Sequence, residues 1–424
     1  MSPSSPPTGV LPERFIPLQR TTVRSLCMDQ LTGVLSPEEL AHVAPVADLL
    51  EALFHHRFHA NLERLKDIYA PFDPDLDARL VPTVTPEERA SRHAQLTTEL
   101  EAVLTAANYE PLSREDLEAA LDEESLFRIR LHVDFDDFDH VLFYRRGEDL
   151  RTEEVSTFFG LKTRKLTFRN YDRVVVFVTF RGPEHFAAKG RSELMFDPGA
   201  TLVKMFRNVP RADLEMLFPN TEVRMKTKDK VVLGVPAAVS GVVLLTTKLG
   251  PTLLLVASMV SFWMGLKDQP IVLDQAALVI LGAGFATIGG FLFQQVSKFQ
   301  NRKIRFMKTL SDSLYFRNLD NNAGVFHRLI DAAEEEECKE ALLAWTFLLK
   351  ATEPLDEAGL DLAVEAALHA HIGEAVDFEV SDALAKLVEL DLVTVHDNGV
   401  LDAVLPTEAA RRLDARWDGL YRYA

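Results

Sequence analysis

The sequence from Val231 to Phe293 is almost continuously apolar and contains three segments: VVLGVPAAVSGVVLLTT at 231–247, LGPTLLLVASMVSFWMGL at 249–266 and AALVILGAGFATIGGFLF at 276–293. A helix of about 20 apolar residues, rising about 1.5 Å per residue, suffices to cross the hydrocarbon core of a bilayer. The stretch therefore predicts a membrane insert over 226–297, an integral membrane protein and the lipid bilayer as a partner.

Basic residues crowd both ends of this insert. Lysine and arginine beside membrane segments favour the cytoplasmic side, so both soluble regions are predicted to be cytoplasmic, at the bacterial cytoplasmic membrane. An even number of crossings follows, with one segment entering without crossing; three crossings are the alternative. The residues that determine this topology are Arg224, Lys226, Lys228 and Lys230 before the insert, and Lys298, Arg302, Lys303 and Arg305 after it.

Small residues recur every four positions in the last apolar segment, at Gly282, Ala286 and Gly290. Such a stripe lets another helix approach closely. It is expected to pack within the insert, or alternatively to join subunits into a homo-oligomer.

The composition narrows the classes of partner. The formal net charge of -18 disfavours a nucleic-acid partner, because binding a phosphate backbone requires clustered lysine and arginine. The two cysteines, Cys27 and Cys338, exclude a disulfide framework and indicate a reducing compartment.

The rest of the chain divides by the period of its apolar residues. A disordered tail (1–12) is followed by a helical region (13–125), in which Ser36 begins a capping signal. In a mixed α/β unit (126–225), alternation predicts a strand at Phe127–Phe135, the run at Val174–Phe180 a central strand, and Thr201–Phe206 an edge strand.

After the insert, a helical region (298–352) is expected to contain helices at Ser297–Asn318 and Gly324–Leu349. The last part (353–424) has the order helix, helix, strand, turn, strand, with Asp397-Asn398-Gly399 as the hairpin turn. This winged-helix-like unit lacks a basic recognition helix, which favours contact with a protein over contact with DNA.

Two blocks carry a resemblance to a known family. The residues FRNVPRADLEMLFP at 206–219, YFRNLDNN at 315–322 and ECKEALLA at 337–344 resemble the transmembrane-protein-143-like family of mitochondrial, bacterial and plant membrane proteins. The resemblance implies soluble domains on each side of a helical insert, but transfers no activity and no functional residue. The fold class expected is thus an α+β membrane protein with a helical N-terminal region, a sheet unit, a two- or three-segment transmembrane insert and a winged-helix-like end.

Four groups of polar residues are considered as possible sites. His55, His59 and Glu63 fall at four-residue spacing and form a weak metal candidate, although a solvated helix face is favoured. Aspartates at 134, 136, 137 and 139 could collect a hard cation such as calcium or magnesium, but a solvent-facing strand edge blunted by charge is favoured. Glu334–Glu337 are expected to form a solvated helix surface. Asp320-Asn321-Asn322 is expected to form a turn or cap.

The sequence contains neither a phosphate-binding glycine loop nor a hydrolase nucleophile motif, so no catalytic residue and no cofactor is predicted. The function expected is a membrane-anchored adaptor or scaffold that binds an unknown protein partner. A small homo-oligomeric channel subunit is the first alternative, and a membrane-surface enzyme the second.

Overall fold

The computed structural model describes residues 12–76, 84–117, 130–157, 162–191, 194, 196–224, 250–266 and 274–421. The chain divides into two compact units. The first contains 1–124, 135–214 and 317–424, and the second contains 125–134 and 215–316. Residues 1–11 of the predicted disordered tail lie outside the described residues.

The first unit begins with three helices: α1 (Arg20–Leu31), α2 (Pro37–Tyr69) and α3 (Pro86–Ala106). The predicted cap at Ser36 is confirmed, because its side chain accepts a hydrogen bond from the backbone N–H of Glu39. Thr85 and Glu88 form a full capping box at the start of α3. The starts of α2 and α3 are therefore fixed by hydrogen bonds between residues three positions apart.

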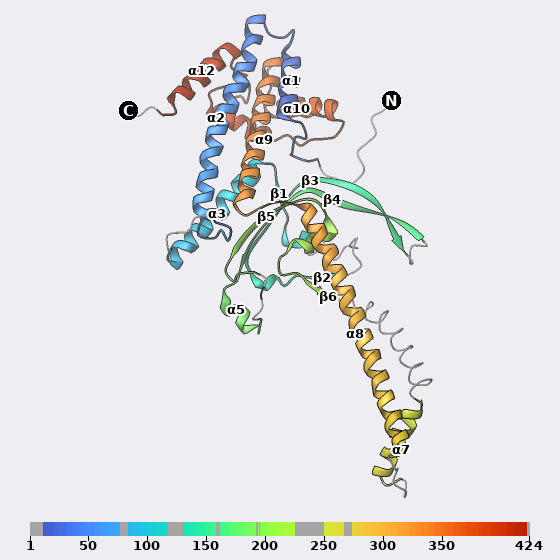
Figure 1. Ribbon diagram of the computed structural model, residues 1–424. Helices are drawn as coiled ribbons and strands as arrows, with labels where there is room; N and C mark the ends of the chain where they lie inside the picture. The colour runs from blue at the N-terminus through green and yellow to red at the C-terminus, as the bar shows by residue number, and fades with distance from the viewer. Residues whose placement is uncertain are drawn as a thin grey trace. The chain divides into compact units, whose positions relative to one another are not determined.

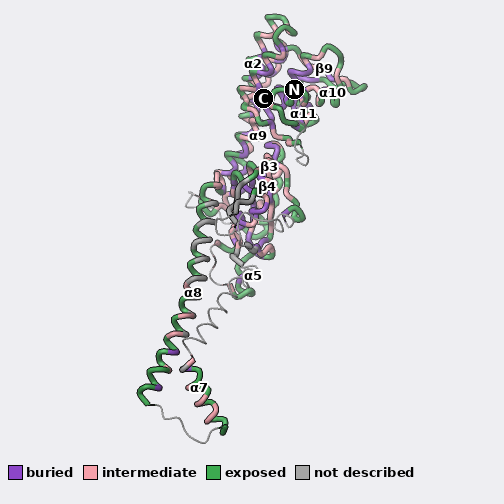
Figure 2. The backbone as a smooth tube through the Cα atoms, turned by 90° about the vertical axis from the view of Figure 1, so that its right-hand side faces the viewer, coloured by how far each residue is buried: buried purple, intermediate pink, exposed green. Residues whose placement is uncertain are grey.

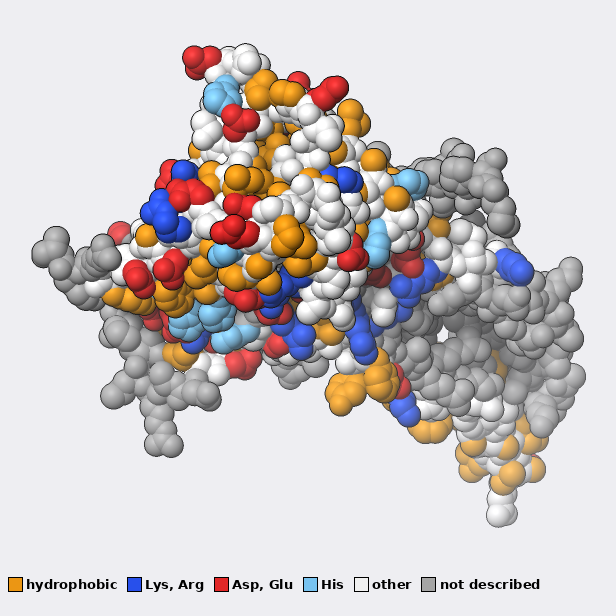
Figure 3. All heavy atoms as spheres, turned by 90° about the horizontal axis from the view of Figure 1, so that it is seen from above, with side chains coloured by type: hydrophobic (Ala, Val, Ile, Leu, Met, Phe, Trp, Pro, Cys, Tyr) orange, Lys and Arg blue, Asp and Glu red, His pale blue; other side chains and the backbone are white. Residues whose placement is uncertain are grey.

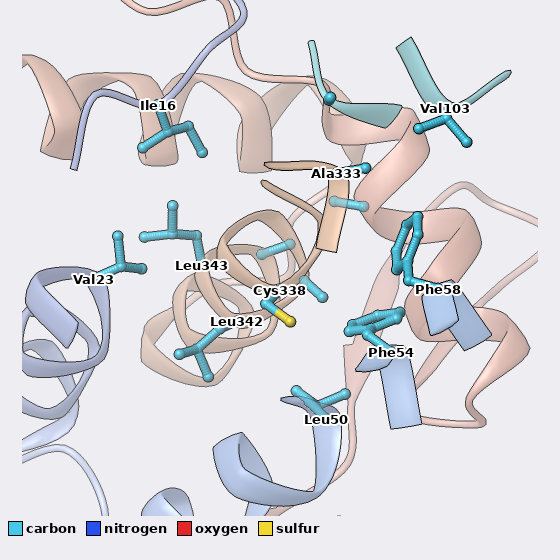
Figure 4. Close-up of a cluster of buried hydrophobic side chains, with 14 of the residues drawn as sticks. Ile16, Val23, Leu50, Phe54, Phe58, Val103, Ala333, Cys338, Leu342 and Leu343 are labelled. Atoms are coloured by element: carbon cyan, nitrogen blue, oxygen red, sulfur yellow. The ribbon is translucent and has the colours of Figure 1, made fainter. Parts of the chain in front are cut away.

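The centre of this unit is α9 (Ala323–Lys350), which packs against α1, α2, α3, α10 and α11. The side chains that fill the interface with α2 include Leu50, Phe54 and Phe58 from α2, and Cys338 and Leu342 from α9 (Figure 4). Buried residues accordingly run along α9 in Figure 2. A helix surrounded by neighbours buries most of its circumference, including positions that carry charge.

A five-stranded antiparallel sheet completes the first unit, in the order β1-β3-β4-β5-β7. Its strands are β1 (Glu110–Pro111), β3 (Phe138–Thr157), β4 (Lys162–Phe180), β5 (Thr201–Pro210) and β7 (Asn318–Asn321). The run predicted as a central strand lies in β4, the middle strand of the sheet. The segment predicted as an edge strand lies in β5, and that part of the prediction is wrong because β7 pairs along its other side.

Strands β3 and β4 form a long hairpin whose register continues from Phe138↔Phe180 to Thr157↔Lys162 (Figure 1). Gly147 interrupts β3 with a positive φ of 73°, and a Cβ there would come within 2.8 Å of Asp172 Cβ. Glycine is therefore required at this position both for its backbone conformation and for its lack of a side chain. After β4 comes the short helix α5 (Pro183–Ala188).

The C-terminal part contains α10 (Glu357–Ile372), α11 (Val380–Glu389), β8 (Val393–Val395), β9 (Leu401–Ala403) and α12 (Pro406–Gly419). This is the predicted helix, helix, hairpin order. It packs on α2 and α9, since α12 lies along α2 while α10 and α11 contact α9 (Figure 1). The core of the first unit is consequently continuous from Ile16 to Leu413.

The second unit contains the two-stranded pair β2 (Arg130–His132) and β6 (Glu222–Arg224), and the helices α7 (Gly250–Trp263) and α8 (Gln275–Arg317). Helix α8 continues without a break through the two separate helices that the sequence predicts at Ala276–Phe293 and Ser297–Asn318. The 3-10 helix η2 (Arg211–Leu217) links the two units.

The predicted membrane insert is contradicted. Among the helices that the structure describes, none combines the length and the apolar character needed to cross a bilayer. Helix α7 has 14 residues, which extend about 21 Å against a hydrocarbon core of about 30 Å. The first apolar segment, 231–247, lies outside the described residues. The prediction of an integral protein of the bacterial cytoplasmic membrane is therefore wrong, as is the membrane part of the fold class.

The strand predicted at Phe127–Phe135 is confirmed only in part. Residues 127–129 lie outside the described part of the chain, β2 covers Arg130–His132, and Phe135–Asp137 form the 3-10 helix η1. Apolar and polar residues do alternate in the sequence, but the strand does not continue to Phe135, because Phe135–Asp137 form a 3-10 turn.

Candidate functional site

The structure places the weak metal candidates in separate ion pairs. His55 Nδ1 lies 2.9 Å from Glu334 Oε2, and Glu63 accepts a hydrogen bond from Lys66 at 2.9 Å. The rings of His55 and His59 stack with centroids 6.4 Å apart. Within the described ranges, no three His, Cys, Asp or Glu side chains are grouped so that they could hold a metal ion.

The small-residue stripe does not form the contact between α7 and α8. Gly282, Ala286 and Gly290 are exposed, whereas the close approach occurs at Gly284, where a Cβ would meet the Thr252 side chain at 2.5 Å. Thr252 also donates a hydrogen bond to the Ile280 carbonyl at 3.1 Å. Packing of the stripe against the segment 231–247 or against another subunit stays a prediction, because 231–249 lie outside the described residues.

The residues predicted to determine topology lose that role together with the insert. Arg224 ends β6. The three lysines at 226, 228 and 230 lie outside the described residues. Positions 298, 302, 303 and 305 belong to α8, and their side chains also lie outside what is described.

The acidic group at 134–139 is not a solvent-facing edge throughout. Asp137 is fully buried and binds three cationic or polar groups: His185 at 3.2 Å, Lys189 at 2.9 Å and Arg191 at 2.6 Å. A buried carboxylate requires such partners because unpaired charge is costly to desolvate. Asp137 thus fixes the segment that follows α5.

The motif Asp320-Asn321-Asn322 forms the predicted turn only at Asn322, whose side chain makes no capping hydrogen bond to α9. Asp320 and Asn321 lie in β7. Asn322 occupies the position before α9 with a φ of 50°, and its N–H donates to the Val203 carbonyl at 2.6 Å. Its side-chain oxygen accepts a hydrogen bond from the Tyr69 hydroxyl at 3.1 Å. Beside it, a Cβ on Gly324 would collide with Asp320. The motif joins β7 to α9.

The predicted solvated surface at Glu334–Glu337 is wrong in its second half, and this error leads to the candidate site. Glu336 and Glu337 are buried, as are the next two charged residues of α9, Lys339 and Glu340. A run that reads as a charged exterior face is therefore the interior of a helix cluster.

Two of these carboxylates share one amide. Asn108, just after α3, donates to Glu340 Oε1 at 2.8 Å and to Glu336 Oε2 at 3.3 Å. Glu336 also accepts from the backbone N–H of Ile16 at 3.1 Å and pairs with Lys339 at 2.6 Å. Lys339 donates further to the carbonyl oxygen of Ile16 at 3.0 Å. The N-terminal segment is thereby attached to α9.

Lys386 connects this network to α11. Its ammonium lies 2.8 Å from Asp382, 2.9 Å from Glu340 and 3.7 Å from Glu337. Arg57 of α2 pairs with Glu337 on the other side and lies 3.5 Å from Glu389. Side chains from α2 and α11, together with Asn108 from the segment after α3, therefore meet around the buried carboxylates of α9.

The pKa values follow from this burial. Burial raises the pKa of Glu340 to about 7, although Lys386 and Asn108 oppose the shift. Burial likewise raises the pKa of Glu337, against the attraction of Lys386 and Arg57. Burial alone would lower the pKa of Lys386, but the neighbouring carboxylates outweigh it and raise that pKa. The pKa values of Glu340 and Glu337 thus both lie above that of an exposed glutamate.

A groove of about 330 Å³ opens beside the network, between α2, α3, α9 and α11. The residues that line it are Arg57, Phe58, Asn61, Glu99, Ala102, Val103, Ala106, Glu337, Asp382, Ala385, Lys386 and Glu389. We call it the α11 groove. Its volume is within the range of small ligand sites. Its walls combine apolar surface with six charged side chains.

The charged residues of α9 from Glu334 to Glu340 can be seen in the sequence. The residues that bond to them lie far away along the chain. Ile16 and Glu336 are 320 residues apart. A signal was available in the apolar residues of α9, which occur on every side of the helix around the charged positions.

Residues 171–324 match a family model described as "Protein of unknown function (DUF3754)". The match covers less than half of the chain and includes no residue of the α11 groove. No solved structure matches the chain. Over this stretch the chain is similar to proteins of unknown function, and nothing in the match connects it with the transmembrane-protein-143-like family, so that resemblance stays a prediction.

Proposed function

We propose that this protein is an adaptor that binds a partner protein in the α11 groove. The observation that carries the proposal is the groove itself, which four helices from distant parts of the sequence build around buried ion pairs. A network of this kind holds the groove walls in fixed positions, because each buried charge depends on its partner. Fixed walls reduce the entropy lost on binding.

The chemistry of the lining favours binding over catalysis. The described residues that line the groove include no Ser, Thr, Cys or His side chain, and its one lysine, Lys386, is held by three carboxylates. The groove instead offers alanine and aromatic surface between charged groups. Two of its carboxylates, Asp382 and Glu389, are more than half exposed at the rim.

The C-terminal unit supports contact with a protein. The single lysine of α11, Lys386, is buried against α9, whereas Ser381, Asp382, Ala385, Val388 and Glu389 of this helix are exposed. An acidic outer face repels a phosphate backbone. Acidic side chains are also spread among basic ones over the face seen in Figure 3, consistent with the net charge of -18.

Site-specific photocrosslinking tests the proposal. A photoreactive amino acid replaces Ala385, which lines the groove, or Ala370, an exposed alanine of α10 outside it, in the full chain expressed in its native cells. We expect discrete protein adducts from position 385 that position 370 does not form. Identical adducts from both positions, or none from position 385, would contradict the proposal.

A further inference from the structure

Residues Glu13–Leu18, which precede α1, lie against α9 and form neither a helix nor a strand apart from one isolated bridge at Glu13. We call this segment the strap. Glu336 of α9 accepts a hydrogen bond from the Ile16 N–H at 3.1 Å, and Lys339 donates one to the Ile16 carbonyl oxygen at 3.0 Å. Both α9 side chains are buried, although burying charge is costly. The buried pair thus binds both backbone groups of one strap residue, as a neighbouring strand would.

One side chain anchors the strap in the core. Ile16 is fully buried and is one of the side chains around α9 in Figure 4. Phe15 is only half-buried, and its ring centroid lies 4.2 Å from Arg146 Cζ and 5.3 Å from Lys339 Nζ. Arg14 is exposed. A segment near a chain end with so few apolar contacts opens at a lower free-energy cost than the packed helices do, so it can leave α9 while they stay folded.

A continuous network of buried hydrogen bonds joins the strap to the α11 groove. Glu336 Oε2 accepts from the Ile16 N–H and, at 3.3 Å, from the Asn108 amide. The same amide donates to Glu340 Oε1 at 2.8 Å. Glu340 Oε2 in turn accepts from Lys386 at 2.9 Å, and Lys386 lines the groove. All the side chains of this relay are buried, so a member that loses a partner is not simply satisfied by bulk water.

Release of the strap removes a partner from three members of the network. Glu336 loses the Ile16 N–H, and Lys339 loses the Ile16 carbonyl oxygen. Asn108 loses the Arg14 carbonyl oxygen, to which its amide donates at 3.3 Å. Buried polar groups without partners rearrange or admit water. The network then no longer fixes the lysine of α11.

The strap also binds the residues that lead into α11. The Asp377 N–H donates to the Glu13 carbonyl oxygen at 2.9 Å, and Arg14 pairs with Glu379 at 2.6 Å. Glu379 directly precedes α11. This helix supplies four residues to the groove: Asp382, Ala385, Lys386 and Glu389. The buried network and the direct contact therefore act on the same helix at two places.

We infer that the strap regulates the α11 groove: bound to α9, it holds α11 in the position that forms the groove, and its release frees α11 and abolishes binding there. The two sites are distinct, because none of the described residues that line the groove belongs to the strap. The network that joins them gives their coupling a physical path. This inference rests on the proposed adaptor function and adds its regulation.

Hydrogen–deuterium exchange of the full chain, followed by mass spectrometry, tests it. Ile16→Ala removes the anchor of the strap, and we expect the amides of α11 to exchange at least tenfold faster because α11 opens more often. Amides of α2 should keep their rates, which separates the effect from general destabilisation. The control is Val23→Ala, which truncates a fully buried side chain of α1, a helix that also packs on α9, and should leave α11 exchange unchanged.

A second pair of variants spares the core. Arg14→Gln breaks the partly exposed pair with Glu379 and should speed exchange of α11 about threefold, the effect of one such ion pair. Arg24→Gln breaks a similar pair, between α1 and Asp48 at 2.7 Å, and should not change it. Urea midpoints confirm that all four variants fold.

Exchange of α11 that is unchanged in both strap variants, or raised equally by the α1 controls, would overturn the inference. Photocrosslinking at position 385 separates it from the proposed function. Ile16→Ala should lose most of the adducts that the parent chain forms; adducts that persist would leave the adaptor function standing and refute its regulation by the strap. If the parent chain forms none while α11 loosens as expected, the adaptor function is refuted and the hold of the strap on α11 stands.

Discussion

Replacing Lys386 with methionine tests the buried network most directly. The lysine side chain is 6% exposed and holds Glu340 at 2.9 Å and Glu337 at 3.7 Å. Lys386→Met keeps the length and apolar stem of the side chain but leaves Glu340 without a cation. Removing one partner of a buried pair costs about 3–5 kcal/mol, and we expect a loss of that size in the free energy of unfolding at pH 8.

The loss of stability caused by Lys386→Met should depend on pH. The pKa of Glu340 is raised from 4.5 to about 7 in the folded protein, so between these values the folded state holds a proton that the unfolded state has released. This stabilisation is present at low pH and is lost as pH rises through the folded pKa, by about 3 kcal/mol in total. Without Lys386 the folded pKa rises further, so Lys386→Met should be most harmful at pH 8 and clearly less so at pH 5.

Urea denaturation at pH 5 and pH 8, followed by circular dichroism, measures both effects. The control is the double variant Lys386→Met with Glu340→Leu, which removes both charges and should recover most of the stability lost at pH 8. A single variant that loses less than about 1 kcal/mol at pH 8 would refute the reasoning, since this is the cost of breaking an exposed pair. A double variant as unstable as the single one would refute it equally.

Three further predictions concern other parts of the first unit. Both cysteines are buried with thiol pKa values of about 12, so mass spectrometry should detect alkylation at pH 8 only after unfolding in urea. Asp137→Ala removes the fully buried carboxylate that pairs with Lys189 and Arg191, and it should lower the urea-derived free energy of unfolding by about 3 kcal/mol; a loss under 1 kcal/mol would contradict this. Gly147→Ala forces a Cβ against Asp172 and should lower the melting temperature more than Gly33→Ala, which has a similar φ of 82° but nothing within 4 Å of its Cβ among the described atoms; equal shifts would show that backbone strain alone matters.

Elements with strong local signals were predictable from the sequence. The cap at Ser36 needs only a hydroxyl and the N–H three residues later. The turn at Asp397-Asn398-Gly399 needs a residue that tolerates positive φ, and Gly399 has a φ of 80°. The apolar run in β4 likewise reflects burial on both faces. In each case the cause lies within a few residues of the effect.

The predictions failed where they rested on the apolar composition of a segment, without knowledge of its neighbours in the fold. The apolar stretch at 231–293 indicated membrane-crossing helices by its length, yet in the second segment α7 accounts for only 14 residues. The edge position assigned to β5 failed because its partner β7 enters the sheet from more than 100 residues later, as the pairing of Lys204 with Asn321 shows. Strand neighbours of this kind leave no mark in the strand itself.

The candidate site separates most clearly what the sequence determines from what the tertiary structure determines. The sequence by itself determined that residues 323–350 form a helix with a dense run of charge, because helical periodicity and propensity are local. Only the tertiary structure decided that Glu336, Glu337 and Glu340 lie inside the protein. Their burial is possible because cations from α2 and α11 and an amide that follows α3 reach them. A charged residue alone favours water, and whether it is buried depends on partners that the fold brings from elsewhere in the chain.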